Sequence, residues 1–449
     1  MAAIAKDRTD LAVPLMRRNF VLNAINGALS MVAARAIDQE TVVSLLVLGL
    51  SGADWAVGLA VSVQHVGRVA TQVFAARALD HTENKRPVYR FYSVARVFAL
   101  LLISGALLLG KGQDPSLILA AVLVGLFVFM LGNGISELAW IDITARSVPS
   151  DRRGGLMTWR RLVGLILAVA LAAPVVDYYL RPGSGYGFPA NYGMLFLFST
   201  LAWGLAWTVF SFVKEPPPHA ATRRLTLRQH FARGLRIVRR DGNYRRLLWQ
   251  RLLSGLACAA PPFFIIFGSR VLGLEARWAA LFITVRTVSE IVASVVFGRI
   301  SDRLGNRAVI VVANWCTLAT FVVAALAAFA ALSGPAGTGG WQSLPVALLG
   351  LAFVGLGCMA PGREMGEFNY MLDIAPAAKR PSYIGFGNAF LLPLGLAPIA
   401  VGALVPAVGY MPVFAGAAVC ALLAIVSTIR LQEPRARQIA EARSACGHH

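Results

Sequence analysis

The sequence predicts an all-α membrane protein in which twelve transmembrane helices form two pseudo-symmetric six-helix bundles. Three observations predict this fold. Of 449 residues, 57% are hydrophobic and only 14% are charged, and the mean hydropathy is +0.64. Twelve apolar runs approach or exceed the roughly 20 residues that cross about 30 Å of hydrocarbon. Basic residues gather in alternate loops, and patterns in the first half of the chain recur in the second.

This composition excludes other classes of protein. Soluble chains average about 45–50% apolar and about 25% charged residues, so a soluble enzyme is excluded. The five cysteines are scattered singly, which excludes a disulfide-rich secreted fold. The N-terminal segment lacks a short apolar core before a small-residue cleavage site, so we interpret it as a cytoplasmic arm and not as a signal peptide.

The apolar runs lie, in chain order, near residues 20–50, 55–76, 91–110, 117–143, 162–180, 192–213, 248–271, 278–299, 308–332, 344–371, 383–407 and 411–430. Polar residues interrupt the first and longest run at Arg35, Asp38, Gln39 and Glu40. Because residues 41–50 are too few to cross a bilayer alone, we interpret the run as one long or broken helix whose polar middle faces a cavity.

The distribution of Lys and Arg predicts the orientation. With the N-terminus inside, most of these residues fall in cytoplasmic loops, and the ones outside are Lys111, Arg181, Arg270 and Arg277. This bias predicts an even number of spans and cytoplasmic termini. The expected organisation is an N-terminal arm (1–18), a first bundle (19–213), a basic linker (214–246), a second bundle (247–430) and a cytoplasmic tail (431–449).

The linker carries much of the inside charge. Apolar residues alternate there with arginines at roughly helical spacing: Leu225, Leu227, Phe231, Leu235 and Val238. We therefore expect a basic amphipathic helix that lies on anionic lipid of the inner leaflet. Linker charge beside such lipid explains these residues without a nucleic-acid partner.

The two halves resemble each other. A Trp and a Phe bound the second and eighth runs at equal separation: Trp55 with Phe74 and Trp278 with Phe297. The fourth and tenth runs end on Asp142-Ile143 and Asp373-Ile374, each with a glycine at the same distance beyond. We interpret the chain as a duplicated six-helix unit, and such repeats place a substrate site between them near the bilayer midplane.

The most specific motif follows the eighth run and reads Gly298-Arg-Ile-Ser-Asp302-Arg303-Leu-Gly305-Asn-Arg307. It resembles the cytoplasmic loop signature of the major facilitator superfamily, Gly-x-x-x-Asp-Arg-x-Gly followed by basic residues. In that family the carboxylate helps latch one face of the transporter shut. The resemblance therefore implies a gating role for Asp302, with Arg303 anchoring the turn on the inside.

The corresponding turn after the second run is degraded. It keeps Asp80 as a third gating candidate but has Ala76 and Glu83 where the signature has glycines. The alternative, that both turns only orient the loops, stays open. The fourth run lacks the buried Arg of many proton-coupled members, and the fifth lacks a clear Gly-Pro pattern of exporters. The resemblance spans the chain and implies a prokaryotic inner-membrane protein.

Ionisable residues inside the runs are the candidates for binding, because each costs about 2.5–3.5 kcal/mol at a helix centre and should face a cavity. His65 and Arg68 share a polar face of the second run, as Asn23 and Asn26 do on the first. We predict a substrate site of Asn23, Asn26, Arg35, His65, Arg68, Arg286, Glu290 and Arg363. The central arginines favour an anionic solute, unless Asp38, Glu137 or Asp142 cancels their charge.

Three carboxylates are candidates for proton coupling: Glu290, Glu137 and Glu367. Glu290 lies one helical turn from Arg286, and Glu367 lies one turn from Arg363, so each can pair along its helix. Such a pair can load or release a proton when the arginine moves or a substrate arrives. The alternative is that these pairs only neutralise each other between packed helices.

The predicted function is secondary active transport of a small organic solute by alternating access, coupled to protons. No enzyme activity, cofactor or metal is expected, since no phosphate loop, nucleophile elbow or metal-binding helix motif is present. The expected partners are the solute, protons and membrane lipid, without nucleic acid, for a chain acting as a monomer. The alternatives are a uniporter and a non-transporting member of the fold that acts as a sensor or assembly factor.

Overall fold

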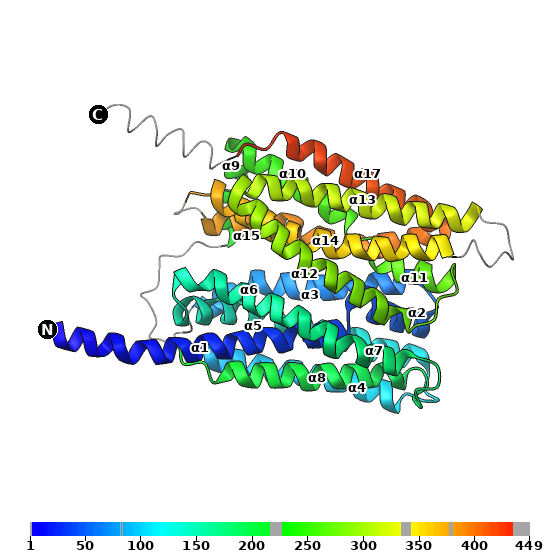
Figure 1. Ribbon diagram of the computed structural model, residues 1–449, viewed down its shortest axis with the longest axis horizontal. Helices are drawn as coiled ribbons and strands as arrows, with labels where there is room; N and C mark the ends of the chain where they lie inside the picture. Colours follow the sequence, from blue (N-terminus) through cyan, green and yellow to red (C-terminus); the bar gives the residue numbers. More distant parts are fainter. Residues whose placement is uncertain are drawn as a thin grey trace. The chain divides into compact units, whose positions relative to one another are not determined.

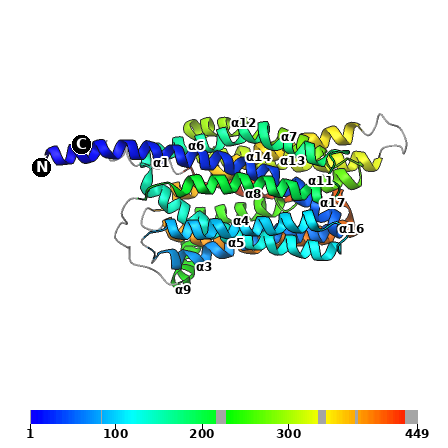
Figure 2. The same cartoon turned by 90° about the horizontal axis from the view of Figure 1, so that it is seen from below.

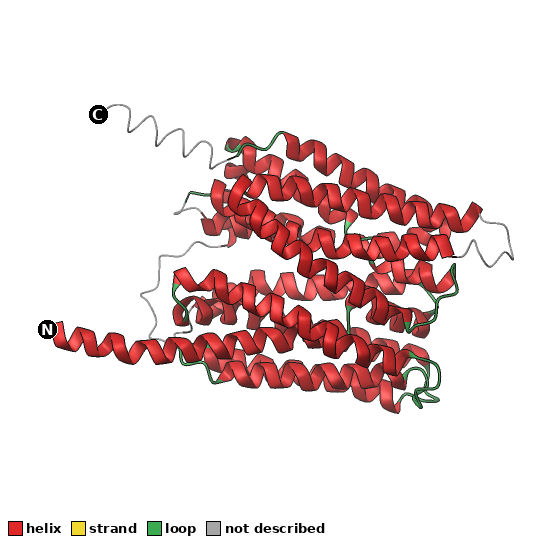
Figure 3. Ribbon diagram, in the orientation of Figure 1, coloured by secondary structure: helices red, strands yellow, loops and turns green. Residues whose placement is uncertain are grey.

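The computed structural model describes residues 2–80, 82, 84–215, 227–333, 343–376 and 380–433, and every regular element in these ranges is a helix (Figure 3). Eleven helical segments are long and apolar enough to cross a membrane: Leu15–Ser51, Arg86–Leu109, Pro115–Ser147, Arg152–Leu180, Ala190–Ser211, Gly242–Arg270, Trp278–Leu304, Asn306–Ser333, Ser343–Ile374, Tyr383–Val408 and Tyr410–Ile429. Helix α3 (Asp54–Asp80) adds a further 27-residue helix, so the count agrees with the expected twelve.

The chain divides into two compact units. Unit 1 comprises Met1–Ala56, Ala60–Thr222 and Glu275–Thr284, and unit 2 comprises Val57–Leu59, Arg223–Leu274 and Val285–His449. The elements of unit 1 are α1 (Ala2–Ala36), η1 (Gln39–Val43), α2 (Ser44–Ser51), most of α3, α4 (Arg86–Leu109), α5 (Pro115–Ser147), α6 (Ser150–Leu167), η2 (Ala168–Ala172), α7 (Ala173–Leu180) and α8 (Ala190–Ser211).

Unit 2 contains the remaining helices. They are α9 (Leu227–Arg240), α10 (Gly242–Ala257), α11 (Pro262–Arg270), most of α12 (Trp278–Leu304), α13 (Asn306–Ser333), α14 (Ser343–Ile374), α15 (Arg380–Leu391), η4 (Leu392–Leu396), α16 (Ala397–Val408) and α17 (Tyr410–Ile429). Several spans of the sequence are therefore interrupted helices, with short π-helical or 3₁₀ segments joining two α-helical pieces.

The first span is broken, which is one of the two forms that the sequence left open. Helix α1 ends at Ala36, and the π-helical segment η1 begins at Gln39. The Asp38 carboxylate caps the second piece by accepting a hydrogen bond from the Glu40 backbone nitrogen at 3.1 Å, and it pairs with Arg35 at 3.1 Å. Because this carboxylate satisfies backbone donors at the break, the polar middle of the run stabilises the interruption itself.

Within unit 1, α1 packs against α6 and α8, and α4 packs against α5 and α8. In the two perpendicular views of Figures 1 and 2, α1 lies alongside α6 and α8. Within unit 2, α13 packs against α14 and α17, while α10 lies beside α17. Aromatic rings fill part of this second core, where Phe264 of α11 makes edge-to-face contacts with Phe321, Phe353 and Phe414.

Two close helix approaches repeat between the units. A Cβ at Gly134 of α5 would lie 2.6 Å from the Arg68 carbonyl oxygen of α3. A Cβ at Gly357 of α14 would collide with the Arg286 carbonyl oxygen of α12 in the same way. Both glycines let two backbones touch, which a side chain would prevent. This matching geometry supports the predicted duplication of a six-helix unit.

The predicted linker helix is present as α9, and part of its apolar face packs on protein. Ile237 and Val238 pack against the core of unit 2 formed by Tyr244, Leu247 and neighbouring residues, and α9 contacts α10 and α15. Gly234 abuts the ring of Phe386. Val238 of the predicted apolar face thus packs on protein, whereas Leu235 is 42% exposed, and the expectation that the face lies on lipid stays a prediction. Leu225 and the side chains of Leu227 and Phe231 lie outside the described residues.

Candidate functional site

The asparagines of α1 form a hydrogen-bonded seam inside unit 1. Asn23 donates to the Thr144 hydroxyl at 2.9 Å and accepts from the Trp140 indole at 3.2 Å. Asn26 donates to the Ala206 carbonyl oxygen at 2.9 Å. Both residues are buried, so these predicted substrate ligands first serve to join α1 to α5 and α8.

Arg160 of α6 is held by this seam. Its Nη1 donates to the carbonyl and side-chain oxygens of Asn23 and to the Asn26 side-chain oxygen, the last at 3.1 Å. Its guanidinium stacks on Trp140 at 4.5 Å from the ring centroid. The side chain is half-buried. Sequence reasoning assigned Arg160 to a cytoplasmic loop and missed it as a site residue.

Arg96 of α4 is a second arginine that sequence reasoning missed, although it lies inside the predicted run 91–110. It donates to the Asn133 side-chain oxygen at 3.0 Å and the Ser93 hydroxyl at 3.1 Å. Its guanidinium lies 3.8 Å from the Trp207 ring centroid, and Glu137 is near enough to attract it. The residue is only 4% exposed, so it is sealed among α4, α5 and α8.

The other predicted residues of unit 1 are placed differently. Arg35 pairs with Asp38 and has a local role at the helix break. On α3, His65 is half-buried and Arg68 is exposed, and Glu137 of α5 is half-buried. The structure therefore brings Asn23 and Asn26 together, but it joins them to Arg160 and not to Arg35.

In unit 2 the polar centre lies where α10 meets α14. Arg251 pairs with Glu367 at 3.1 Å, and both side chains are mostly buried. Gln250 donates to the same carboxylate at 3.3 Å and to Asn314 at 3.2 Å, and Asn314 donates onward to the Thr428 hydroxyl at 2.8 Å. The network links four helices through one carboxylate.

The predicted pairing of Glu367 with Arg363 is therefore wrong. Glu367 turns to Arg251 of α10, a residue the sequence placed in the same half without assigning it a role. The guanidinium of Arg251 reaches the Glu367 carboxylate while the aliphatic part of the arginine side chain lies between the helices. Arg363 is half-buried on α14. On α12, Arg286 is half-buried, and Glu290 is buried with 5% of its surface exposed.

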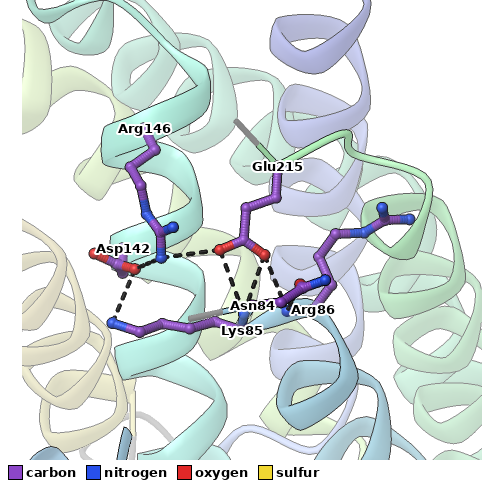
Figure 4. A network of polar contacts seen from close by, with 6 residues as sticks. All are labelled: Asn84, Lys85, Arg86, Asp142, Arg146 and Glu215. Atoms are coloured by element: carbon purple, nitrogen blue, oxygen red, sulfur yellow. Dashed lines mark hydrogen bonds and ion pairs between the residues drawn. The ribbon is translucent and has the colours of Figure 1, made fainter. Parts of the chain in front are cut away.

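Figure 4 shows a network of ion pairs and hydrogen bonds in unit 1 around Asp142, Arg146 and Glu215. Asp142 of α5 pairs with Lys85 at 2.9 Å and with Arg146, one turn further along its helix. Arg146 also pairs with Glu215 at 2.9 Å, and Glu215 accepts from the backbone nitrogens of Lys85 and Arg86. The network thus joins the start of α4, the end of α5 and the segment after α8.

In unit 2 the corresponding helix ends are joined by two sets of hydrogen bonds, one of which ends on the carboxylate of Asp373. Asn306 donates to Asp373 at 2.7 Å and accepts from the Ser301 hydroxyl at 2.7 Å. The Tyr370 hydroxyl donates to the Gln432 carbonyl oxygen at 2.6 Å, and Asn243 donates to the Tyr370 oxygen at 2.8 Å. Asn306 begins α13 and Asp373 ends α14, as Lys85 precedes α4 and Asp142 lies near the end of α5.

A layer of arginines that bond the last helical carbonyls is common to both units. Arg18 and Arg86 donate to the carbonyl oxygens of Phe212 and Ser211 after and at the end of α8. In unit 2 the corresponding bonds end α17: Arg246 donates to Arg430, and Arg307 donates to Ile429. Shortly after these acceptors the chain reads Lys214-Glu-Pro in unit 1 and Gln432-Glu-Pro in unit 2. This repeat is a sequence signal of the duplication that the sequence analysis did not use.

Of the predicted gating residues, Asp302 and Arg303 are exposed at the end of α12. Gly305 has φ +86°, so the signature glycine makes the left-handed turn for which it was selected. The side chain of Asp80 lies outside the described residues. Over the part of the chain that the structure describes, no three His, Cys, Asp or Glu side chains gather as metal ligands.

Comparison with known proteins places this fold among transporters. A sequence model of the family described as the Major Facilitator Superfamily matches residues 19–389. The D-xylose-proton symporter is similar with a TM-score of 0.66 at 14% identity, over 94% of this chain and 98% of the symporter. The nucleoside transporter NupG gives 0.63 at 13% identity, over 93% and 98%. No curated protein matches the chain in sequence.

A bacterial homologue of the iron transporter ferroportin, in its inward-facing state, is similar with a TM-score of 0.64 at 15% identity, over 92% of this chain and 98% of the homologue. At these identities the likeness shows the fold alone. It confirms the predicted all-α fold, while the family model over residues 19–389 confirms the family resemblance drawn from the loop signature.

Proposed function

Because the chain belongs to the major facilitator superfamily, a family of membrane transporters, we propose that it is a secondary active transporter that moves a small organic solute by alternating access and is driven by protons. We place it in a prokaryotic inner membrane with both termini cytoplasmic, acting as a monomer. This orientation rests on the bias of basic residues toward one set of loops.

The observation that carries the proposal is the burial of Glu290. This residue is 5% exposed in the middle of α12, a helix apolar enough to span a membrane. A carboxylate costs several kcal/mol at such a depth, and transporters retain ionisable groups there for proton relays. The D-xylose-proton symporter, which shares the fold, is a precedent for proton coupling in this architecture.

Two further carboxylates support the same interpretation. Glu367 faces Arg251 across α10 and α14, so a proton on Glu367 would release the guanidinium. Glu137 lies within the electrostatic reach of Arg96. Protonation at any of the three changes the charge balance between helices, and a solute gradient can be coupled to that change.

The test is made in lipid vesicles that hold the purified protein and a pH-sensitive dye. Organic anions, sugars and nucleosides are added in turn, and a solute that alters lumenal pH is then followed in labelled form. Glu290→Gln should abolish accumulation driven by a pH gradient and keep exchange of solute at equal pH. Glu275→Gln removes an exposed acid from the loop before α12 and should change neither.

Unchanged accumulation by Glu290→Gln would remove this residue from the mechanism. Solute uptake that never moves lumenal pH would establish a uniporter instead. The solute itself is identified by the screen, because nothing in the family or the fold names it.

A further inference from the structure

Arg35, Arg96 and Arg160 lie within candidate spans of unit 1 and are buried or half-buried, and they differ in how their charge is balanced. Arg35 has the carboxylate of Asp38 at 3.1 Å. Arg96 is sealed, with Glu137 in electrostatic reach. Arg160 has neither, since no carboxylate among the described residues forms an ion pair with it. A cation enclosed by α1 and α5 just before the apolar part of its span calls for a negative partner.

One edge of the Arg160 guanidinium, formed by Nε and Nη2, donates no hydrogen bond to the described residues. All three hydrogen bonds of Arg160 come from Nη1, and they end on Asn23 and Asn26. Its Nε and Nη2 make no hydrogen bond to any described residue, and neither nitrogen is among the buried polar atoms that lack a partner. These two donors therefore lie where solvent or a solute can reach them.

The surroundings hold this edge in one orientation. Trp140 stacks on the guanidinium plane from α5, and the two asparagines fix Nη1 from α1. Gly27 makes room for the side chain, because a Cβ there would lie 2.6 Å from the Arg160 Cγ and 2.7 Å from its Nε. Residues of three helices thus immobilise a cation whose two remaining donors are parallel.

Parallel guanidinium donors match the two oxygens of a carboxylate or a phosphate group. We propose that Arg160 is the anchor for an anionic group on the transported solute, with Asn23, Asn26, Trp140 and Gly27 as its positioning residues. This inference rests on the proposed transport function and specifies its substrate class as an organic anion. It also explains why Asn23 and Asn26 sit on a polar face of α1 without contacting solute themselves.

Chemical modification tests the site without any assay of transport. The full-length protein is placed in discs of phosphatidylcholine and treated with phenylglyoxal, and modified arginines are found by peptide mass spectrometry. Arg160 should react, and the sealed Arg96 should not. Succinate or inorganic phosphate at ten times its dissociation constant should slow the reaction at Arg160 about tenfold, because about nine-tenths of the sites are then occupied.

The source of the anion is distinguished by a second set of discs that contain phosphatidylglycerol and no added anion. If the solute occupies the site, this lipid leaves the rate at Arg160 unchanged. Protection by phosphatidylglycerol alone would show that Arg160 binds a lipid headgroup and would overturn the proposal.

Variants supply an independent measure through stabilisation of the folded protein by succinate or phosphate. Arg160→Gln should bind these anions about tenfold to a hundredfold more weakly, as expected for a lost charge-assisted hydrogen bond. Arg160→Lys keeps the charge without the paired donors and should fall between. Arg152→Gln removes an exposed charge from the same helix and should bind as the wild type does.

The proposal is wrong if Arg160 resists phenylglyoxal, if neither anion protects it, or if Arg160→Gln binds the anions as tightly as the wild type. These outcomes are separate from those of the transport assay. A protein that accumulates a neutral sugar with protons, yet shows no protection at Arg160, keeps the transport function and loses the anion site. Protection without proton-driven accumulation gives the reverse result.

Discussion

The two units close the same end of their helices with different chemistry. In unit 1, Lys85, Asp142, Arg146 and Glu215 form a chain of ion pairs (Figure 4). In unit 2 the Lys85 position is taken by Asn306, which forms a neutral-to-charged hydrogen bond with Asp373. The duplicated fold thus keeps the location of the network and changes its charge.

What the units share shows which part of the network is structural. In both, arginines donate to the carbonyl oxygens at the end of the last helix, where intrahelical donors are missing. These arginine bonds satisfy backbone carbonyl groups that every helix end has, so each copy of the six-helix unit needs them. The ion pairs beyond these bonds depend on side chains, which are free to diverge once the helix ends are bound. The divergent layer is therefore the one that can give each unit its own function.

The largest expected effect is at Glu215, the carboxylate through which three segments of unit 1 meet. Its side chain is 5% exposed and pairs with Arg146, which is 12% exposed. Glu215→Gln removes one of two carboxylates that pair with the mostly buried Arg146, and Asp142 remains. Because loss of the whole partner of a buried charge costs about 3–5 kcal/mol, we expect a loss of about 3 kcal/mol, the low end of that range. The free energy of unfolding in detergent micelles, measured by denaturant titration, should fall by that amount.

Glu433 is the matched control in unit 2, because it follows α17 as Glu215 follows α8. Its Oε1 is buried and has no hydrogen-bond partner among the described residues. Glu433→Gln should change the free energy of unfolding by less than about 1 kcal/mol. Equal losses for the two variants would contradict the distinction between the ion-paired network of unit 1 and the hydrogen-bonded contacts of unit 2.

An intermediate effect is expected at Tyr370, which joins Asn243 at the start of α10 to the segment after α17. Its hydroxyl donates to the Gln432 carbonyl oxygen and accepts from Asn243. Tyr370→Phe removes these two hydrogen bonds at about 0.5–1.5 kcal/mol each, so the loss should be about 1–3 kcal/mol. The melting temperature of the variant should fall by the same amount at low and high salt, since no ion pair is lost. A salt-dependent loss would show that charge also operates here.

The fold could be predicted from the sequence because hydropathy is a property of whole segments and not of single contacts. Twenty apolar residues cannot be accommodated in water, so the spans and their count followed from composition alone. The break in the first span was also predictable, since Asp38 and its neighbours could not stay within a regular apolar helix. Helix ends and the π-helical joints were less predictable, because they depend on tertiary contacts.

The candidate site was harder to predict because polar side chains choose partners across helices. Spacing along one helix suggested that Glu367 pairs with Arg363, yet Arg251 lies closer on a neighbouring helix. Arg160 was missed for a related reason: it stands at the edge of a basic loop, and only packing shows that α1 and α5 enclose it. Which residues face each other is a property of helix rotation, which one sequence does not specify.

The smallest expected effects concern the shared layer, where the two units should behave alike. Arg86 donates to the Ser211 carbonyl oxygen at 3.2 Å, and Arg307 donates to that of Ile429 at 3.1 Å. Arg86→Lys and Arg307→Lys keep the charge near the helix end but lose the planar donor. Each should therefore cost about 0.5–1.5 kcal/mol, the usual value of one hydrogen bond. Denaturant titration of both variants should give equal losses, because the geometry is the same. A loss confined to Arg86→Lys would mean that the backbone layer has diverged along with the ion pairs, and the two units would then share only their helix arrangement.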